Sequence, residues 1–185
     1  MVFQGVDELE VPDVYHIWDI NVFGVLRVTR EFMKILPANG AVVSIASIAG
    51  LFSGPFFGYY AMTKHAIVSL MDSLRRENLS TAFRFVTICP GFVRTPLLSL
   101  LNDLQFDEAH SRHAKTAEAR MTSNRVRLHE KSQSPEHVAQ VICDQAIFRH
   151  HPVPIILIDR PIARFIYRLL SIAPARFSDL LMRFI

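Results

Sequence analysis

This chain of 185 residues lacks the marks of several classes of protein. Its two cysteines, Cys89 and Cys143, lie far apart without CxxC spacing, so we expect buried free thiols in a reducing compartment. No stretch approaches 18 uninterrupted apolar residues, so no helix is expected to span a membrane. The first residues carry neither the basic nor the apolar region of a signal peptide, which predicts a cytoplasmic protein.

An excess of charge of one sign is also absent. The chain has 20 basic and 17 acidic residues, a formal net charge of +3 and no basic run, so we expect no nucleic-acid partner. Two histidine pairs, His110 with His113 and His150 with His151, lack acidic or cysteine partners, so no metal site is expected. Half of the residues are hydrophobic, which suits a single domain over residues 1–185 with a sizeable core.

The first long element that the sequence predicts is a helix. Apolar residues repeat at alternating steps of four and three, which predicts a helix of more than six turns that ends near Pro37. The members of this stripe are Val14, Trp18, Asn21, Val25, Val28, Phe32 and Ile35. Asn21 is the polar member, and a buried amide without a hydrogen bond costs about 1–3 kcal/mol. Asn21 therefore either bonds a nearby backbone carbonyl or belongs to a site.

Short apolar runs then alternate with helical segments. We predict strands at residues 41–47, 83–89 and 152–158, with helices at 60–79 and 134–148 between them. Residues 95–133 are helical in character but irregular, and such a segment between strands usually covers something. The alternation of strand and helix predicts an α/β fold with a parallel sheet.

The stretch from Ser47 to Lys64 carries the residues most suggestive of chemistry. Ser47 ends a predicted strand, Tyr60 follows thirteen positions later, and Lys64 lies four residues beyond it. Positions i and i+4 share a helix face, so the Lys64 ammonium could favour the Tyr60 phenolate by about 3 kcal/mol and lower its pKa. Such a pair also arises by chance. Ser47, the Tyr60 helix and the Pro90-Gly91 turn nevertheless all fall at the carboxyl edge of the predicted sheet, where ligands bind.

These residues resemble the carboxyl-terminal part of a short-chain dehydrogenase/reductase. The matching elements are Asn21 within NVFG, Ser47 within SIASIAG, Tyr60 and Lys64 within YAMTK, and PGFVRT from Pro90 to Thr95. Order and spacing agree as well as identity, and the resemblance runs over nearly the whole chain. It implies a Rossmann-like sheet.

The resemblance also implies a role for each residue. Tyr60 would be the general acid/base, Ser47 would hydrogen-bond the substrate oxygen, and Lys64 would lower the tyrosine pKa. Asn21 would anchor a water of the proton relay. NAD or NADP would lie against Tyr60, Lys64, Pro90, Gly91, Val93 and Thr95, and residues 96–133 would form a substrate lid. The implied reaction is hydride transfer between NAD(P) and an alcohol or a ketone or aldehyde. The apolar residues of the lid indicate a lipophilic substrate.

The sequence departs from the family in its glycines. The Gly-rich turn that receives the pyrophosphate at a helix N-terminus is not found, and the regular spacing Gly50, Gly54, Gly58 lies in the loop before Tyr60. We therefore expect a Rossmann-like domain truncated at the N-terminus, with strand 41–47 at an exposed sheet edge.

The resemblance also implies a partner, a second copy of the chain. In this family two long helices, here residues 13–36 and 59–79, form a dimer interface, so a homo-oligomer is expected. A catalytically silent protein that keeps this interface is the alternative to an active enzyme.

The segment from about 159 to 185 is amphipathic, with one basic and one apolar face. It either docks on its own domain or a partner subunit, or makes peripheral contact with a membrane. The basic residues are Arg160, Arg164 and Arg168, and the apolar ones are Ile162, Phe165, Ile166, Leu169 and Leu170, followed by Phe177, Leu180, Leu181, Phe184 and Ile185.

Overall fold

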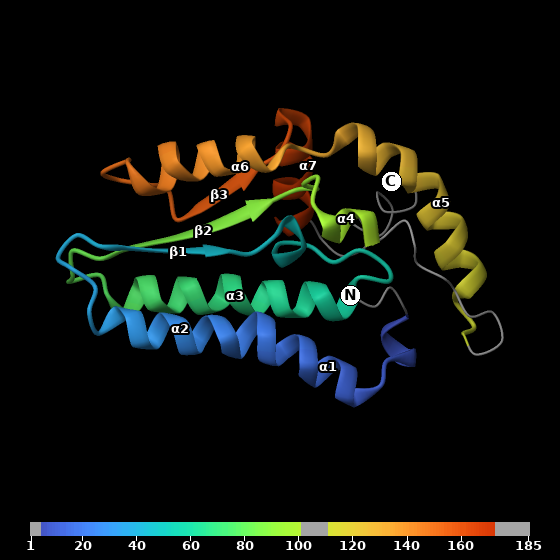
Figure 1. Cartoon of the computed structure of the whole chain (residues 1–185), viewed down its shortest axis with the longest axis horizontal. Helices are drawn as coiled ribbons and strands as arrows, with labels where there is room; N and C mark the ends of the chain where they lie inside the picture. Colours follow the sequence, from blue (N-terminus) through green and yellow to red (C-terminus); the bar gives the residue numbers. More distant parts are fainter. Residues whose placement is uncertain (1–4, 101–110, 173–185) are drawn as a thin grey trace.

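The computed structural model of the chain describes residues 5–100 and 111–172. A parallel sheet of three strands lies between two helical layers (Figure 1). The strands are β1 (Ala41–Ile45), β2 (Arg84–Pro90) and β3 (Ile155–Ile158), in the spatial order β1-β2-β3. Ala41 pairs with Arg84 and Thr87 pairs with Ile155, both in parallel register. The predicted α/β class and its parallel, Rossmann-like sheet are confirmed.

The helices divide between the two faces and the carboxyl edge of the sheet (Figure 1). One face carries α1 (Val11–Trp18), the π-helical turn η2 (Asp19–Phe23), α2 (Gly24–Met33) and α3 (Gly58–Glu77). The other face carries α6 (Pro135–Ile142) and the π-helical turn η4 (Cys143–Ile147). Near the carboxyl ends of the strands lie α4 (Pro96–Leu100), α5 (Ala114–Lys131) and α7 (Pro161–Ile172). Two short 3-10 turns, η1 (Val6–Glu8) and η3 (Ile48–Gly50), complete the described elements.

The central strand β2 is buried on both faces, which explains its nearly continuous apolar sequence. Phe85 and Cys89 belong to a core cluster on the α3 side, whereas Val86 and Ile88 belong to one on the α6 side. Because successive side chains of a strand point to opposite faces, this single strand supplies both cores. It therefore fixes the positions of the helices around the sheet.

Strand β1 occupies an edge of the sheet in the described part of the chain, as the sequence predicted. The Ile45 side chain at its carboxyl end is 55% exposed. The carboxyl ends of β1 and β2 lie side by side, because Ile45 pairs with Ile88.

The predicted helix over residues 14–35 is present from residue 11 to residue 33, but its inner face changes half-way. Val28, Phe32 and Ile35 are 58%, 61% and 75% exposed, whereas Thr29 is buried. The π-helical turn η2 accommodates one extra residue, so the residues after it are rotated by about 100° relative to an uninterrupted α-helix. The prediction that the second half of the stripe lies on the same face as the first half is therefore wrong.

Helix α7 docks on its own domain. Tyr167 stacks on Phe52 with a centroid distance of 5.2 Å and an interplanar angle of 11°, and Leu170 is buried. Ile162 and Phe165 are 70% and 67% exposed, so the apolar face predicted as one surface is divided between core and exterior. Phe177, Leu180, Leu181, Phe184 and Ile185 lie outside the described residues.

In the described ranges, no helix has the length and apolar character needed to cross a membrane. These ranges also hold no group of three or more side chains that could bind a metal ion, and His110 lies outside them. Both cysteines are free; Cys89 is buried and Cys143 is half-buried.

Candidate active site

Ser47 follows strand β1 and caps the short turn η3. Its Oγ accepts a hydrogen bond from the Ala49 N–H at 3.1 Å and is also hydrogen-bonded to the Tyr60 phenol. Turn η3 packs directly on α3: a Cβ added at Gly50 would lie 2.7 Å from the Lys64 carbonyl oxygen. This close approach brings the serine at the end of the strand to the tyrosine at the start of the helix.

Tyr60 lies in the first turn of α3, and its phenol is largely buried. Burial raises the pKa of Tyr60, and the hydrogen bond with Ser47 offsets part of this rise. The Lys64 ammonium lies 5.6 Å from the centroid of the Tyr60 ring. Burial therefore has the larger effect on the Tyr60 pKa in this structure, and the expected lowering of that pKa by Lys64 stays a prediction.

Lys64 is held against the end of strand β1. Its Nζ donates a hydrogen bond to the Ile45 carbonyl at 3.2 Å. Burial lowers the pKa of Lys64, while the neighbouring Cys89 raises it slightly. In turn, burial raises the pKa of the Cys89 thiol to about 11, against smaller opposing effects from the Ser47 backbone and the Lys64 charge. The ammonium group therefore has a fixed place between the strand and the tyrosine ring.

Asn21 has the hydrogen-bond partner that its half-buried amide requires. Its Nδ2 donates to the Thr63 Oγ1 at 3.0 Å, and that hydroxyl donates to the Tyr60 carbonyl at 2.8 Å. Thr63 is fully buried, and Asn21 lies in the π-helical turn η2. π-helical turns within α-helices are frequent at functional sites. The two hydrogen bonds join this turn to the start of α3 at the level of Tyr60.

The turn that follows β2 brings Pro90, Gly91, Val93 and Thr95 to the same edge of the sheet. The Gly91 N–H donates to the Ile158 carbonyl at 2.9 Å. A Cβ on Gly91 would lie 2.0 Å from the Asp159 Oδ2, so no side chain fits there without displacing the carboxylate. The Thr95 hydroxyl makes a long contact of 3.4 Å with the Val93 carbonyl.

Val93 forms an isolated parallel bridge with Gln133. The Gln133 N–H donates to the Phe92 carbonyl at 2.8 Å, and the Arg94 N–H donates to the Gln133 carbonyl at 2.9 Å. In this pattern the N–H and the carbonyl of Val93 itself point away from Gln133. Within residues 5–100 and 111–172 the Val93 N–H has no hydrogen-bond partner. It is thus available to a ligand.

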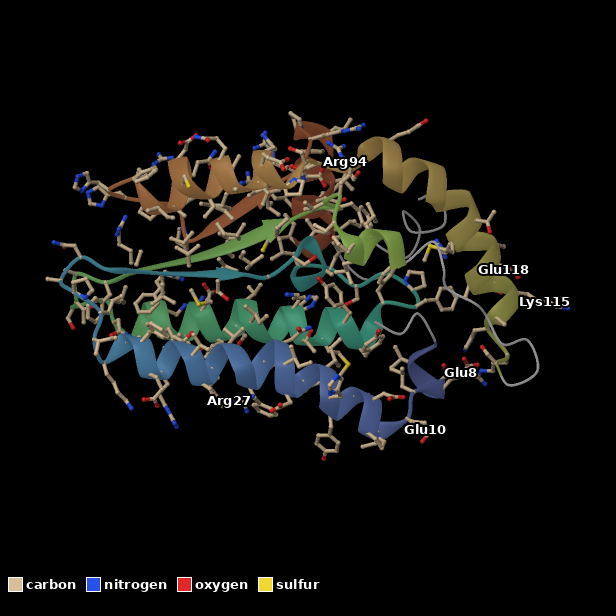
Figure 2. All side chains as sticks on the ribbon, viewed as in Figure 1. Glu8, Glu10, Arg27, Arg94, Lys115 and Glu118 are labelled. Carbon is tan, nitrogen blue, oxygen red and sulfur yellow. The ribbon has the colours of Figure 1, made fainter. Side chains whose placement is uncertain are left out.

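Helix α5 rests on the loop that leads to Tyr60. Ala117 and Met121 are buried against Phe56 and Phe57. Phe56 has a positive φ of 68°, an uncommon conformation for a bulky residue. Figure 2 shows Lys115 near the start of α5 and Arg94 near the other end of this helix. The predicted lid segment is therefore in contact with the loop before the tyrosine.

The approach to α5 is also tied to the N-terminal turn η1. Arg112 and His113 both contact the Asp7 carboxylate, and the His113 Nε2 lies 3.1 Å from the Asp7 Oδ1. Ser111 donates to the Glu8 carboxylate at 2.7 Å. These contacts join the start of α5 to the turn η1.

Sequence reasoning missed three residues that hold this site together: Thr63, Gln133 and Asp159. Thr63 lies inside the YAMTK motif, and its position three residues after Tyr60 could have pointed to a hydrogen bond with the Tyr60 carbonyl. Gln133 and Asp159 carry no comparable signal, because their partners lie in distant segments of the chain.

Comparison with known proteins agrees with the geometry. A family model described as short chain dehydrogenase matches residues 1–105. Oxidoreductase UcpA of Escherichia coli K12 is 41% identical over 86 residues, which is 45% of this chain and 32% of that protein. Alcohol dehydrogenase 1 of Ceratitis cosyra is 29% identical over 154 residues, 77% of this chain and 56% of that protein.

The fold has solved counterparts as well. A short chain dehydrogenase/reductase from Burkholderia phymatum in complex with NAD superimposes with a TM-score of 0.70 at 24% identity, covering 97% of this chain and 63% of that one. At this identity the likeness supports the fold alone. The chain spans about a third of the length of curated relatives such as UcpA.

Proposed function

This chain belongs to the short-chain dehydrogenase family, and we propose that it is an oxidoreductase that transfers hydride between NAD or NADP and an alcohol or carbonyl substrate. The hydrogen-bonded pair of Ser47 and Tyr60 carries the proposal. Both groups lie at the carboxyl edge of a parallel sheet, where α/β proteins bind their ligands. A substrate oxygen placed between them would meet two hydroxyl groups at once.

Each residue has a distinct part in the proposed reaction. Because burial raises the Tyr60 pKa, the phenol is protonated at neutral pH and can donate its proton to a carbonyl oxygen during reduction. Ser47 would hydrogen-bond the same oxygen. Lys64 would stabilise the phenolate left behind, and the Asn21–Thr63 hydrogen bond would hold the start of α3 in place. A bound nicotinamide supplies or accepts the hydride.

The residues present suit the nicotinamide end of a dinucleotide. Among the described residues the Val93 N–H has no hydrogen-bond partner, and it lies at the carboxyl edge of the sheet. Gly91 has no side chain, so the backbone of the turn is open to a ligand at that position. Lys64, Val93 and Thr95 would bind the ribose and the carboxamide. Family structures are known with NADP+ and with NAD, and both dinucleotides remain candidates for this chain.

A lipophilic substrate suits the surroundings of Tyr60. Phe56 and Phe57 join Ala117 and Met121 in an apolar cluster between the tyrosine loop and α5. An apolar group next to the reacting oxygen would bury its surface against this cluster at about 25 cal/mol per Å². Turnover should therefore improve along a series of ketones of increasing chain length.

Assembly with a second copy is the proposed interaction. The exposed Val28, Phe32 and Ile35 form an apolar strip along α2 and its C-terminal end, and burying such a strip stabilises a dimer. A catalytically silent protein would use the same surface. Replacing Phe32 by glutamate should shift the chain towards monomer in light-scattering measurements, whereas an unchanged mass would exclude this strip as the interface.

Peripheral membrane contact is a second proposed interaction. It rests on Ile162 and Phe165, two exposed apolar side chains of α7. Flotation with anionic vesicles, compared between the wild type and Phe165→Glu, would test it. Equal flotation of the two proteins would contradict it.

Calorimetric titration of the full chain with NAD and NADP separates the enzyme from the silent alternative. A dissociation constant in the micromolar range for either dinucleotide is expected of the enzyme. The matched variant Lys64→Met should bind more weakly, because it loses the proposed contact with the ribose. Absence of binding at millimolar concentrations would favour the silent interaction protein.

A further inference from the structure

Gln133 lies just beyond the end of α5 and makes three hydrogen bonds with two separate segments. Its backbone N–H and carbonyl bond Phe92 and Arg94, as described above, and its side-chain Nε2 donates to the Ile158 carbonyl at 2.7 Å. The first two bonds hold the turn after β2, and the third holds the end of β3. One residue therefore connects the substrate-lid segment, the turn and the sheet.

The Ile158 carbonyl accepts hydrogen bonds from both the turn after β2 and Gln133. It accepts the Gly91 N–H at 2.9 Å as well as the Gln133 side chain, and a carbonyl oxygen has lone pairs for both. Gly91, Phe92 and Arg94 are thus all bound, directly or through Ile158, to the same glutamine. The Asp159 carboxylate lies next to Gly91, where a side chain on that residue would be.

Val93 is the residue between these attachments. Its neighbours Phe92 and Arg94 are both bonded to Gln133, so the Val93 peptide groups must point the other way. The bridge has a single residue pair and no adjoining ladder. The two backbone hydrogen bonds of this bridge alone would let the segment after α5 rotate relative to the turn. The hydrogen bond from the Gln133 side chain to Ile158 restricts this rotation.

We propose that Gln133 is a positioning residue, which orients the free Val93 N–H towards the nicotinamide through its side-chain bond to Ile158. The inference rests on the proposed function for the identity of the ligand. The role needs an amide donor on a side chain of this length. Arg94 reinforces the arrangement, since its Nη1 donates to the Ser132 carbonyl at 2.8 Å, and Figure 2 shows Arg94 beside the junction of α5 and α6.

Hydrogen exchange of the full chain without dinucleotide tests the positioning directly. Gln133→Met keeps the length of the side chain and removes its donor. We expect amide exchange at Gly91, Arg94 and Gln133 to become about five-fold faster, the factor that corresponds to one neutral hydrogen bond of about 1 kcal/mol. Exchange in β1 should not change. The matched control is Gln140→Met, because Gln140 is an exposed glutamine on α6 that bonds only Asp144 among the described contacts.

A fluorescence titration with NADH adds a readout that a purely structural role would not alter. Gln133→Met should bind NADH about five-fold more weakly than the wild type. Gln133→Glu should bind weakly at pH 8, where its carboxylate repels the Ile158 carbonyl. That repulsion also favours the protonated acid, so binding should tighten towards pH 5 as protonation restores a donor. The wild type should show no such difference between the two pH values beyond that of the Gln140→Met control.

Exchange rates of Gly91, Arg94 and Gln133 that stay within a factor of two in Gln133→Met would overturn the inference. Equally faster exchange in β1 and at the turn would overturn it too, since that pattern indicates general destabilisation. A wild-type chain that does not bind NADH would count against the proposed function, and the three exchange rates would still decide whether Gln133 holds the turn.

Discussion

Replacing Thr63 by valine removes the hydroxyl that joins Asn21 to the start of α3. Thr63 is fully buried, so the valine methyl fills the same volume and the packing stays nearly constant. The hydroxyl makes two hydrogen bonds, at 3.0 Å from the Asn21 amide and at 2.8 Å to the Tyr60 carbonyl. At about 1 kcal/mol net for each bond, we expect the free energy of unfolding to fall by about 2 kcal/mol.

Urea denaturation followed by circular dichroism measures this change, and thermal unfolding should show a midpoint lower by about 4–8 °C for a chain of this size. Thr116→Val is the matched control, since Thr116 lies exposed on α5 and its replacement should change stability by less than about 0.5 kcal/mol. Combining Thr63→Val with Asn21→Ala should give a coupling energy of about 1 kcal/mol. A Thr63→Val chain as stable as the control, or strictly additive effects in the double variant, would refute the role of this link.

Three further changes test the packing and electrostatics of the site. Gly91→Ala places a methyl group 2.0 Å from the Asp159 Oδ2, so urea unfolding should show a loss of about 1–3 kcal/mol that Asp159→Ala in the same chain largely restores. Gly50→Ala places its Cβ 2.7 Å from the backbone oxygen of Lys64, which cannot move aside, so an unchanged thermal midpoint would contradict the close packing of η3 on α3. Burial raises the pKa of Cys89 from 9.0 to about 11, so stability that is complete below pH 9 should fall by about 2 kcal/mol as the pH rises through 11. Cys89→Ala should reduce the fall by about this amount, and the part that remains would come from Tyr60 and Tyr167, whose pKa values burial also raises.

The sequence predicted the parts of the fold that depend on local pattern. The strands have apolar, branched sequences, and glycine and proline mark their ends, so the positions of Ser47 and of the Pro90-Gly91 turn followed directly. The parallel order then brought Ser47, Tyr60 and Lys64 to one edge, and the structure places them there. The polar Asn21 in an apolar stripe indicated a hydrogen-bonded amide, but its observed partner is the Thr63 hydroxyl and not a nearby backbone carbonyl.

Other features depend on contacts that a linear pattern does not contain. The π-helical turn η2 shifts the inner face of α2, because one extra residue in the turn changes the phase of the helix. The direction of the Tyr60 pKa depends on how deeply the phenol is buried, whereas the prediction considered only the charge of Lys64. Gln133 reaches Ile158 across 25 residues of sequence, and only the folded chain reveals this partner.

Turnover by the full chain tests the central claim most directly. Absorbance at 340 nm reports the oxidation of NADH or NADPH in the presence of a series of aliphatic ketones. We expect Tyr60→Phe to reduce the rate by a factor of about 10² to 10⁴, the usual contribution of a general acid. Tyr15→Phe, which alters an exposed tyrosine on α1, should keep the wild-type rate. A Tyr60→Phe chain that reduces ketones as fast as the Tyr15→Phe chain would contradict the assignment of this site.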